Sequence, residues 1–182
     1  MVLNNKAQLF TFYFPSNFWY EEVEQKWTDY IKRMKLPYES VEDFMNQQVQ
    51  QVTFPSMTMT TASQTREQYE VVYYGGKELE VEMQKELRVT FKLTESYLSY
   101  WIIFDQMDRF LHYTNGPENK HPCWMEPVKL GFLTDSGIQL IDFTFYEITP
   151  INTTELTLSY AATVASYNTF SWTLHYNRFE IS

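Results

Sequence analysis

Short strand-like segments joined by short connections run through most of this 182-residue sequence, and they limit the possible folds more than any other feature. Each segment is rich in β-branched and aromatic residues or alternates apolar with polar residues, and Pro, Gly or polar residues separate the segments. Most connections are too short for the crossovers that parallel strands need, so we expect antiparallel sheet. The expected strands are residues 9–14, 48–54, 57–61, 69–74, 79–93, 128–134, 138–147, 155–161 and 169–181.

Residues 94–113 have the pattern of a long helix that is apolar almost all the way round. Thr94 and Glu95 suit a helix N-terminus, and the sequence Asn-Gly-Pro at 115–117 ends the pattern. A helix of this kind must be buried from more than one direction. One side can pack on its own sheet, and we expect the other to pack on a neighbouring subunit.

A second helical region, residues 16–48, interrupts the strands early in the chain. Apolar residues recur every three or four positions from Trp19 to Met34, which predicts an amphipathic helix. Ser40 followed by Asp43 predicts the start of a short second helix. We therefore expect a mainly β (α+β) fold in one domain, residues 1–182, with residues 16–48 as a helical insertion. The architecture would be an antiparallel β-sandwich or partly closed barrel with one flanking helix.

The amino-acid composition limits which kinds of function the protein can have. Aromatic residues make up 18% of the chain, more than a small core usually needs, so we expect some of these rings in subunit contacts. The net charge of −9 argues against a surface that grips nucleic acid. An acidic wall instead suits a channel through which DNA slides, because like charge keeps phosphates from sticking.

The cysteine content and the lack of long apolar runs predict a soluble protein. The single cysteine, Cys123, excludes an intramolecular disulfide and fits a reducing cytoplasm. The first residues lack the apolar run of a secretory signal, and no stretch of about 20 apolar residues could span a membrane.

Three motifs occur in a characteristic order. Residues 52–56 (Val-Thr-Phe-Pro-Ser) form a strand that runs into a proline, and residues 87–97 pass from a strand directly into a helix. In the C-terminal run 137–181, a strand ends at a corner containing Pro150, a Glu-Leu-Thr-Leu strand follows, and residues 170–181 close the chain with alternating aromatics. Together these motifs resemble bacteriophage tail tube proteins of the contractile-tail type, including tube initiators.

The resemblance implies a structural virion protein. In that family six copies form a ring, and stacked rings make the tube through which the genome is ejected without specific DNA binding. It implies copies of the same chain, tail sheath, baseplate or neck proteins and a tape measure protein as partners. The implied location is the phage tail, assembled in the host cytoplasm. Helix 94–113 would lie at the subunit interface, the C-terminal strand in the barrel, and the polar segment 62–68 would reach a neighbouring ring.

Two departures from the family pattern leave the exact component open. Residues 16–48 replace a short hairpin connection, and Lys-Glu-Leu at 77–79 replaces an Arg-Thr-Phe-like start. The insertion could face a sheath, a baseplate, a neck or the next ring. The alternative within the same class is therefore a tube-like baseplate initiator or neck ring protein.

Hypotheses from other functional classes, such as a ligand-binding protein or an enzyme, have weaker support in the sequence. A small-ligand-binding β-barrel would use Trp101, Trp124 and Trp172 to line a pocket. A metal site could draw on three residues, but their spacing does not fit a zinc motif: His112, His121 and Cys123. Two carboxylate pairs are better explained as solvated or lumen-facing acids than as an acid/base pair: Asp105 with Asp108, and Glu80 with Glu82. We expect no enzyme activity, no cofactor, and no catalytic, cofactor-binding or metal residue.

Overall fold

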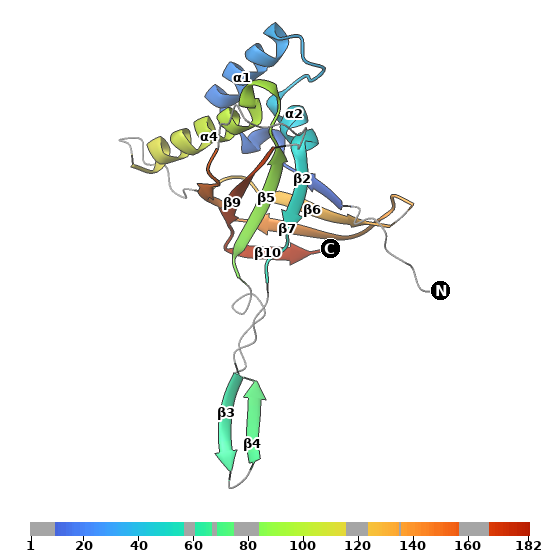
Figure 1. Ribbon diagram of the computed structural model, residues 1–182, viewed down its shortest axis with the longest axis vertical. Coiled ribbons are helices and arrows are strands. Elements are labelled where there is room, and N and C mark those ends of the chain that lie inside the picture. Colours follow the sequence, from blue (N-terminus) through green and yellow to red (C-terminus); the bar gives the residue numbers. More distant parts are fainter. Residues whose placement is uncertain are drawn as a thin grey trace.

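The computed structural model describes residues 10–56, 61–66, 69–74, 84–115, 124–134, 136–156 and 168–182. Two four-stranded antiparallel sheets form the body of the molecule, and neither closes into a barrel (Figure 1). The first sheet has the order β1-β6-β7-β10, with β1 Phe10–Tyr13, β6 Val128–Leu133, β7 Gln139–Tyr146 and β10 Arg178–Ile181. The second sheet has the order β2-β5-β9-β8, with β2 Val49–Thr53, β5 Glu86–Lys92, β9 Thr169–His175 and β8 Thr149–Thr153. The predicted mainly β (α+β), antiparallel fold is confirmed.

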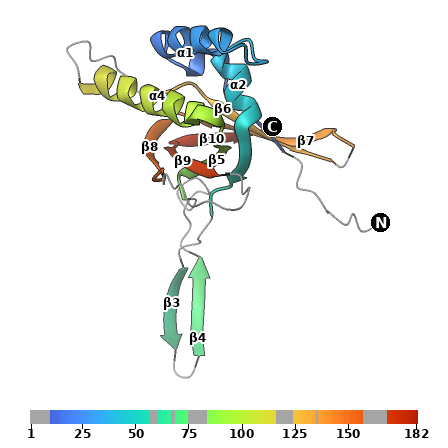
Figure 2. The same ribbon diagram turned by 45° about the horizontal axis from the view of Figure 1, so that its top comes forward.

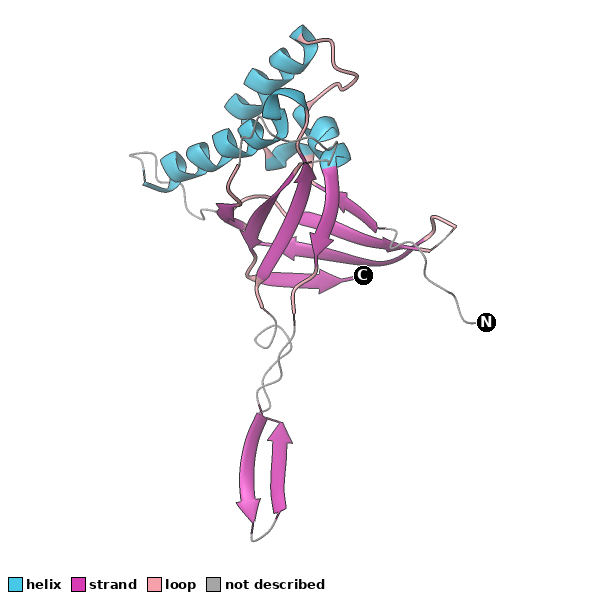
Figure 3. Cartoon of the chain, in the orientation of Figure 1, coloured by secondary structure: helices cyan, strands magenta, loops and turns pink. Residues whose placement is uncertain are grey.

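The helices gather on one side of the two sheets, as Figure 2 and the colouring of Figure 3 show. They comprise η1 Ser16–Phe18, α1 Glu21–Arg33, α2 Val41–Gln48, η2 Glu95–Tyr97 and α4 Leu98–Asn115. Both predicted helical regions are therefore confirmed. The Ser40 hydroxyl accepts a hydrogen bond from the Asp43 backbone N–H at 3.1 Å, as the capping pattern predicts. Within the described residues, no helix is long and apolar enough to cross a membrane.

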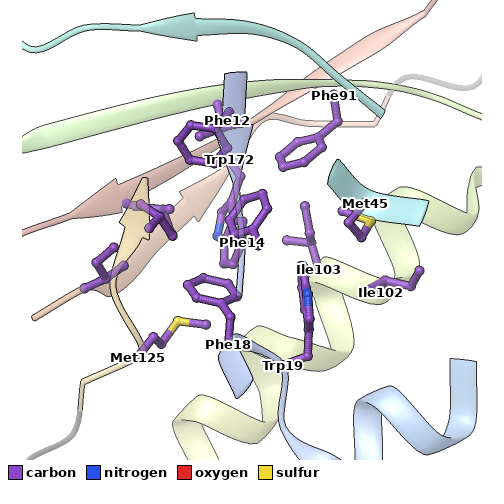
Figure 4. Close-up of a cluster of buried hydrophobic side chains, with 14 of the residues drawn as sticks. Phe12, Phe14, Phe18, Trp19, Met45, Phe91, Ile102, Ile103, Met125 and Trp172 are labelled. Carbon is purple, nitrogen blue, oxygen red and sulfur yellow. The ribbon is translucent and has the colours of Figure 1, made fainter. Parts of the chain in front are cut away.

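Large aromatic side chains join the sheets to the helices in one core (Figure 4). Phe14, which directly follows β1, is completely buried at its centre. Its ring lies 4.8 Å from that of Phe18 and 6.2 Å from that of Trp172 on β9. Ile102 and Ile103 of α4 are also completely buried. The regular alternation of β5 and β9 supplies the sheet side of this core, because every second side chain of a strand points to the same face.

The predicted closing strand 169–181 is wrong as one element. Residues 169–175 form β9 in the second sheet, whereas residues 178–181 form β10 in the first sheet. The chain crosses from one sheet to the other at Asn177, whose N–H donates to the Tyr146 carbonyl at 3.2 Å. The aromatic alternation shifts phase at this point, since Tyr176 and Phe179 are both buried although three positions separate them.

The predicted strand 155–161 is displaced. The observed strand β8 covers Thr149–Thr153 and contains Pro150, which we had expected at a corner. Residues 154–156 are outside any strand, and 157–161 lie outside the described residues. Proline is tolerated here because β8 is an edge strand, where only one side of the backbone pairs.

Residues 62–68, which we expect from the sequence to be a polar loop or an extended arm, belong largely to a separate hairpin. Strand β3, Thr61–Arg66, pairs antiparallel with β4, Tyr69–Tyr74. The strand expected at 69–74 is thus confirmed, whereas most of the one expected at 57–61 and the start of the one expected at 79–93 lie outside the described residues. Both Figure 1 and Figure 2 place this hairpin away from the two sheets, on the side opposite the helices. A two-stranded hairpin is marginally stable alone, so the arm is suited to contact another molecule.

Candidate functional site

The outer face of the second sheet is the first candidate surface. Leu87, Val89 and Phe91 of β5 point to the buried inner face, so the alternating residues of each strand form the outer face. The paired outer residues are polar, whereas Ile151 in the bulge of β8 is an apolar side chain that is 43% exposed. The polar residues are Gln51, Thr53, Glu86, Arg88, Thr90, Lys92, Thr149, Asn152, Thr169, Ser171, Thr173 and His175. The hydroxyls of Thr90 and Ser171 lie 2.9 Å apart in a hydrogen bond between neighbouring strands.

This face is not the acidic wall that the net charge suggests. The outer face carries one negatively charged residue, Glu86, and two positively charged residues, Arg88 and Lys92. The acidity of the chain lies partly in the helical insertion, residues 16–48, which contains seven carboxylates and four cations. A net charge for the whole chain does not reveal which face carries it, and the sequence offered no further signal.

Both sheets end in strands that have a neighbour on one side only. The second sheet ends at β2 and β8, and the first at β1 and β10. Within the described residues no other strand pairs with the outer edges of these four. Open edges expose backbone N–H and C=O groups, which readily pair with another chain. The two sheets could therefore be continued by strands of a neighbouring molecule.

Helix α4 provides a second candidate surface, because the core covers only part of it. Trp101, Phe104 and Leu111 are 44%, 52% and 56% exposed, whereas Ile102 and Ile103 are completely buried. The spacing of the three exposed residues places them on one face of the helix. The prediction that α4 packs on more than its own sheet is correct, but the chain's own helical insertion supplies part of that second cover.

Hydrogen bonds fix the insertion against α4. The buried amide of Gln106 accepts a hydrogen bond from the Tyr20 backbone N–H at 3.0 Å and donates one to the Phe18 carbonyl at 2.9 Å. Asp105 accepts from the Trp27 indole N–H at 2.8 Å and from the ammonium of Lys26 at 2.5 Å. Residues 18–27 therefore have a set orientation relative to α4. Periodicity predicted the helices but gave no signal for these contacts, which join residues about 80 to 90 positions apart.

Three tyrosines donate hydrogen bonds to carboxylates on the surface, and one of them, Tyr113 of α4, donates to Glu22 of α1 at 2.9 Å. Tyr13 of β1 donates to Glu42 of α2 at 2.7 Å, which raises the pKa of Tyr13. Partial desolvation and the negative charge of Glu42 act in the same direction. Tyr146 of β7 donates to Glu180 of β10 at 2.9 Å, and this bond likewise raises the pKa of Tyr146. The phenols of Tyr13 and Tyr146 both stay protonated near neutral pH, so these pairs are structural links between elements.

The tryptophans proposed for a ligand pocket do not come together. Trp172 is completely buried in the core, while Trp101 and Trp124 are 44% and 47% exposed. A cavity of about 460 Å³ does occur between the α1–α2 connection and the junction of β5 with α4. None of the three tryptophans lines it; its walls are Leu36, Pro37, Tyr38, Phe44, Gln48, Lys92, Leu93, Thr94 and Leu98. The tryptophan-lined barrel pocket is therefore wrong.

The residues weighed for metal binding or acid/base chemistry have other surroundings. His112 Nε2 lies 3.7 Å from Asp108 on the exposed side of α4, and Asp105 binds the insertion. His121 and Cys123, like Glu80 and Glu82, lie outside the described residues. In the part of the chain that the structure describes, no three His, Cys, Asp or Glu side chains gather closely enough to hold a metal ion.

Comparison with known proteins bears on the fold. No protein-family model matches the sequence, and no curated protein matches it either. A chain in the cryo-EM structure of the anti-feeding prophage (AFP) baseplate matches with a TM-score of 0.51 and 13% identity, over 74% of this chain and 80% of that one. The AFP tube terminating cap matches with a TM-score of 0.45 and 12% identity, over 74% and 79%. A chain of the sheath/tube terminator of an extracellular contractile injection system (PVC) matches with a TM-score of 0.45 and 14% identity, over 74% and 84%.

At 13% identity, the match to the AFP baseplate chain is evidence for the fold alone. The resemblance to tail tube proteins predicted from the sequence is confirmed at that level, because the chain shares its fold with a component of the AFP baseplate.

Proposed function

We propose that this chain is a structural subunit of a tail-tube-like ring. The observation that carries the proposal is the second sheet, which has a buried apolar inner face, a mostly polar outer face and unpaired edges at β2 and β8. If β2 of one copy pairs with β8 of the next, the sheets join into a continuous barrel around a lumen. Closure of the ring then removes the open edges, which otherwise favour aggregation. The role is structural and requires no catalytic group.

In the proposed assembly six copies form each ring of a contractile phage tail, and the genome passes through the lumen. Hydroxyl and amide side chains dominate the outer face of the second sheet. Such groups give DNA few strong phosphate contacts, which favours sliding over binding. Helix α4 would lie at the interface between copies, and the β3–β4 arm would reach a neighbouring ring. The partners would be sheath, baseplate or neck proteins and a tape measure protein, and residues 1–182 would act as one domain.

A single ring at the baseplate or neck is the second candidate. It is favoured by the insertion, which Gln106 and Asp105 hold rigidly on α4. A rigid helical addition on every subunit would suit a ring that docks another component once. In a repeated tube the same addition would recur along the whole length.

Negative-stain imaging of the concentrated protein, with mass measurement of the particles, tests the proposal. Rings or tubes with an open lumen are the expected result, and tubes would favour the repeated subunit over the single ring. Some tube subunits assemble only on a nucleus, so the protein should also be imaged after addition of purified tail baseplates. A particle that stays monomeric under both conditions would overturn the proposal.

A further inference from the structure

The β6–β7 hairpin exposes large apolar side chains near its tip. Leu140 and Ile141 are 65% and 45% exposed, and Leu140 lies where the register between β6 and β7 shifts. Ile138 at the turn is 64% exposed, and Phe132 of β6 is 37% exposed. We call these four residues the hairpin patch. Four exposed apolar side chains gathered near one hairpin tip are suited to a contact with protein.

The tip of this hairpin is held in one conformation. The Thr134 N–H donates to the Ile138 carbonyl at 2.8 Å, and the Gly137 N–H donates to the Thr134 carbonyl at 2.8 Å. Gly137 has φ of 79°, which a residue with a side chain adopts only at a cost. The Ile138 N–H also donates to the Thr134 hydroxyl at 3.0 Å. A preorganised tip loses little conformational entropy when it binds.

The exposed residues of α4 form a second apolar surface, which we call the helix patch: Trp101, Phe104 and Leu111. The rings of Trp101 and Phe104 pack edge to face with centroids 5.8 Å apart. The Gln106 and Asp105 contacts described above hold the helix rigidly. This surface is therefore also preorganised, and aromatic residues of this kind are typical anchors of protein interfaces.

The two patches differ in shape and lie on different parts of the molecule. In both Figure 1 and Figure 2, the elements that carry them, α4 and the β6–β7 hairpin, extend to opposite sides of the sheets. A two-fold contact would pair a surface with its own copy, whereas two different surfaces on opposite sides suit a repeated head-to-tail contact. Such a contact covers one hairpin patch and one helix patch per copy, in equal numbers.

We propose that the hairpin patch of one copy packs on the helix patch of the next copy. This inference rests on the proposed function, because it names the contact that would hold neighbouring subunits of a ring together. Because these side chains are about half exposed, each can bury on the order of 100 Å² more. Three or four anchors per side therefore cover roughly 300–400 Å² of the roughly 800 Å² per partner of a standard interface. Joined sheet edges would supply the rest.

Two charged variants test the pairing. Leu140→Lys blocks the hairpin patch, and Phe104→Lys blocks the helix patch, where the introduced ammonium also gains Asp108 as a favourable neighbour one turn away. Both side chains are more than half exposed, so we expect near-UV circular dichroism and the unfolding midpoint to stay close to wild type. Met34→Lys, at another apolar side chain that is 52% exposed, is the matched control.

The variants are compared with wild type by sedimentation velocity over a range of concentrations. We expect each single variant to assemble at least 10-fold more weakly than wild type or Met34→Lys. An equimolar mixture of Leu140→Lys and Phe104→Lys copies retains one hairpin patch and one helix patch, so it should form dimers and nothing larger. Assembly of either variant at the wild-type level, or a mixture that stays monomeric while wild type assembles, would overturn the inference.

A cross-linking experiment covers the case in which wild type does not assemble alone. Leu140→Cys and Phe104→Cys copies, each with Cys123→Ser, are mixed and oxidised. The expected product is the mixed disulfide, in several-fold excess over either homodimer; statistical yields would refute the pairing. If both lysine variants form rings as wild type does, this contact is wrong but the proposed function is still supported. Head-to-tail oligomers that lack a lumen would support this contact and count against the proposed function.

Discussion

Replacing Gln106 by Leu removes both hydrogen bonds that tie the start of the helical insertion to α4. Gln106 is completely buried, and its amide pairs with the Tyr20 N–H and the Phe18 carbonyl. Leucine has a similar volume but no polar atom, so two backbone groups lose their partner. The substitution tests whether the insertion is a fixed part of the fold or a loosely attached addition.

The expected loss of stability follows from the two backbone groups left without a partner, the Tyr20 N–H and the Phe18 carbonyl. Each buried backbone donor or acceptor without a partner costs about 1–3 kcal/mol, so the two groups together predict that Gln106→Leu lowers the free energy of unfolding by about 2–6 kcal/mol. The extra apolar contact of leucine offsets part of this loss, which favours the lower half of the range. Since whole domains are stable by about 5–15 kcal/mol, the effect would be large.

Urea unfolding followed by circular dichroism measures this loss. The matched control is Gln25→Leu on α1, where the exposed amide donates to the Glu21 side chain at 2.9 Å. A surface pair of this kind contributes about 0.2–0.5 kcal/mol. Amide hydrogen exchange at Tyr20 should also accelerate in Gln106→Leu and stay unchanged in the control. If the two variants lose the same stability, the Gln106 bonds do not hold the insertion.

The variant Gln106→Glu makes the same contact depend on pH, so that its effect on stability can be measured as a function of pH. A protonated Glu can donate to the Phe18 carbonyl and accept from Tyr20, whereas an ionised one is repelled by that carbonyl and loses its hydration. Both effects should raise the pKa of the new carboxyl in the folded state above its usual value of about 4.3. Folded protein then binds more protons, so stability relative to wild type is best below about pH 4 and falls as pH rises through the raised pKa. A deficit that does not change between pH 4 and pH 7 would contradict the geometry.

Three further variants test other elements. Ser40→Ala removes the cap on the Asp43 N–H and should cost about 1 kcal/mol in urea unfolding, and Ser40→Asp should restore most of it. Tyr13→Phe loses the hydrogen bond to Glu42; because that bond raises the pKa of Tyr13, its stabilisation should persist below about pH 10 and disappear as pH rises through the folded pKa. An unfolding-stability difference between wild type and Tyr13→Phe that persists at the most alkaline pH would argue against this link. Trp172→Ala should cost about 3–5 kcal/mol because the side chain is completely buried, whereas the exposed Trp101→Ala should change stability by less than about 1 kcal/mol.

Local patterns predicted most elements but not how the chain distributes them between sheets. The apolar periodicity of residues 19–34 and the Ser40 cap follow from contacts within a few residues, and both appear in the structure as predicted. Alternation also predicted that the residues of β5 and β9 are extended, since a half-buried strand imposes a period of two. Alternation does not say which sheet a strand joins. The closing run was therefore predicted as one strand, although the shift in phase between Tyr176 and Phe179 was a readable sign of the break.

The assembly surfaces were less predictable, because exposure depends on tertiary packing. The sequence of α4 is apolar on nearly every side, but nothing in it distinguishes Ile103, which is buried, from Phe104, which is half exposed. The difference arises because the core and the insertion cover one side of the helix and leave the other open. Likewise, the hairpin patch follows from the extension of β6 and β7, a property of sheet geometry.

The chain segment that leads from the β3–β4 hairpin into β5 is hydrogen-bonded at the point where the chain crosses between the two sheets. At the crossing, the Tyr176 N–H donates to the Lys85 carbonyl at 3.2 Å, and the ammonium of Lys85 donates to the Asn177 carbonyl at 2.7 Å. Asn177 in turn donates to Tyr146 at the end of β7. Residue 85 immediately precedes β5, on the side of the chain that leads to the β3–β4 hairpin. A displacement of this segment therefore acts on both sheets at once, because one cluster of hydrogen bonds joins it to β9, β10 and β7. In a ring whose lumen is lined by the second sheet, a contact made by the arm would thereby influence the first sheet, which carries the hairpin patch.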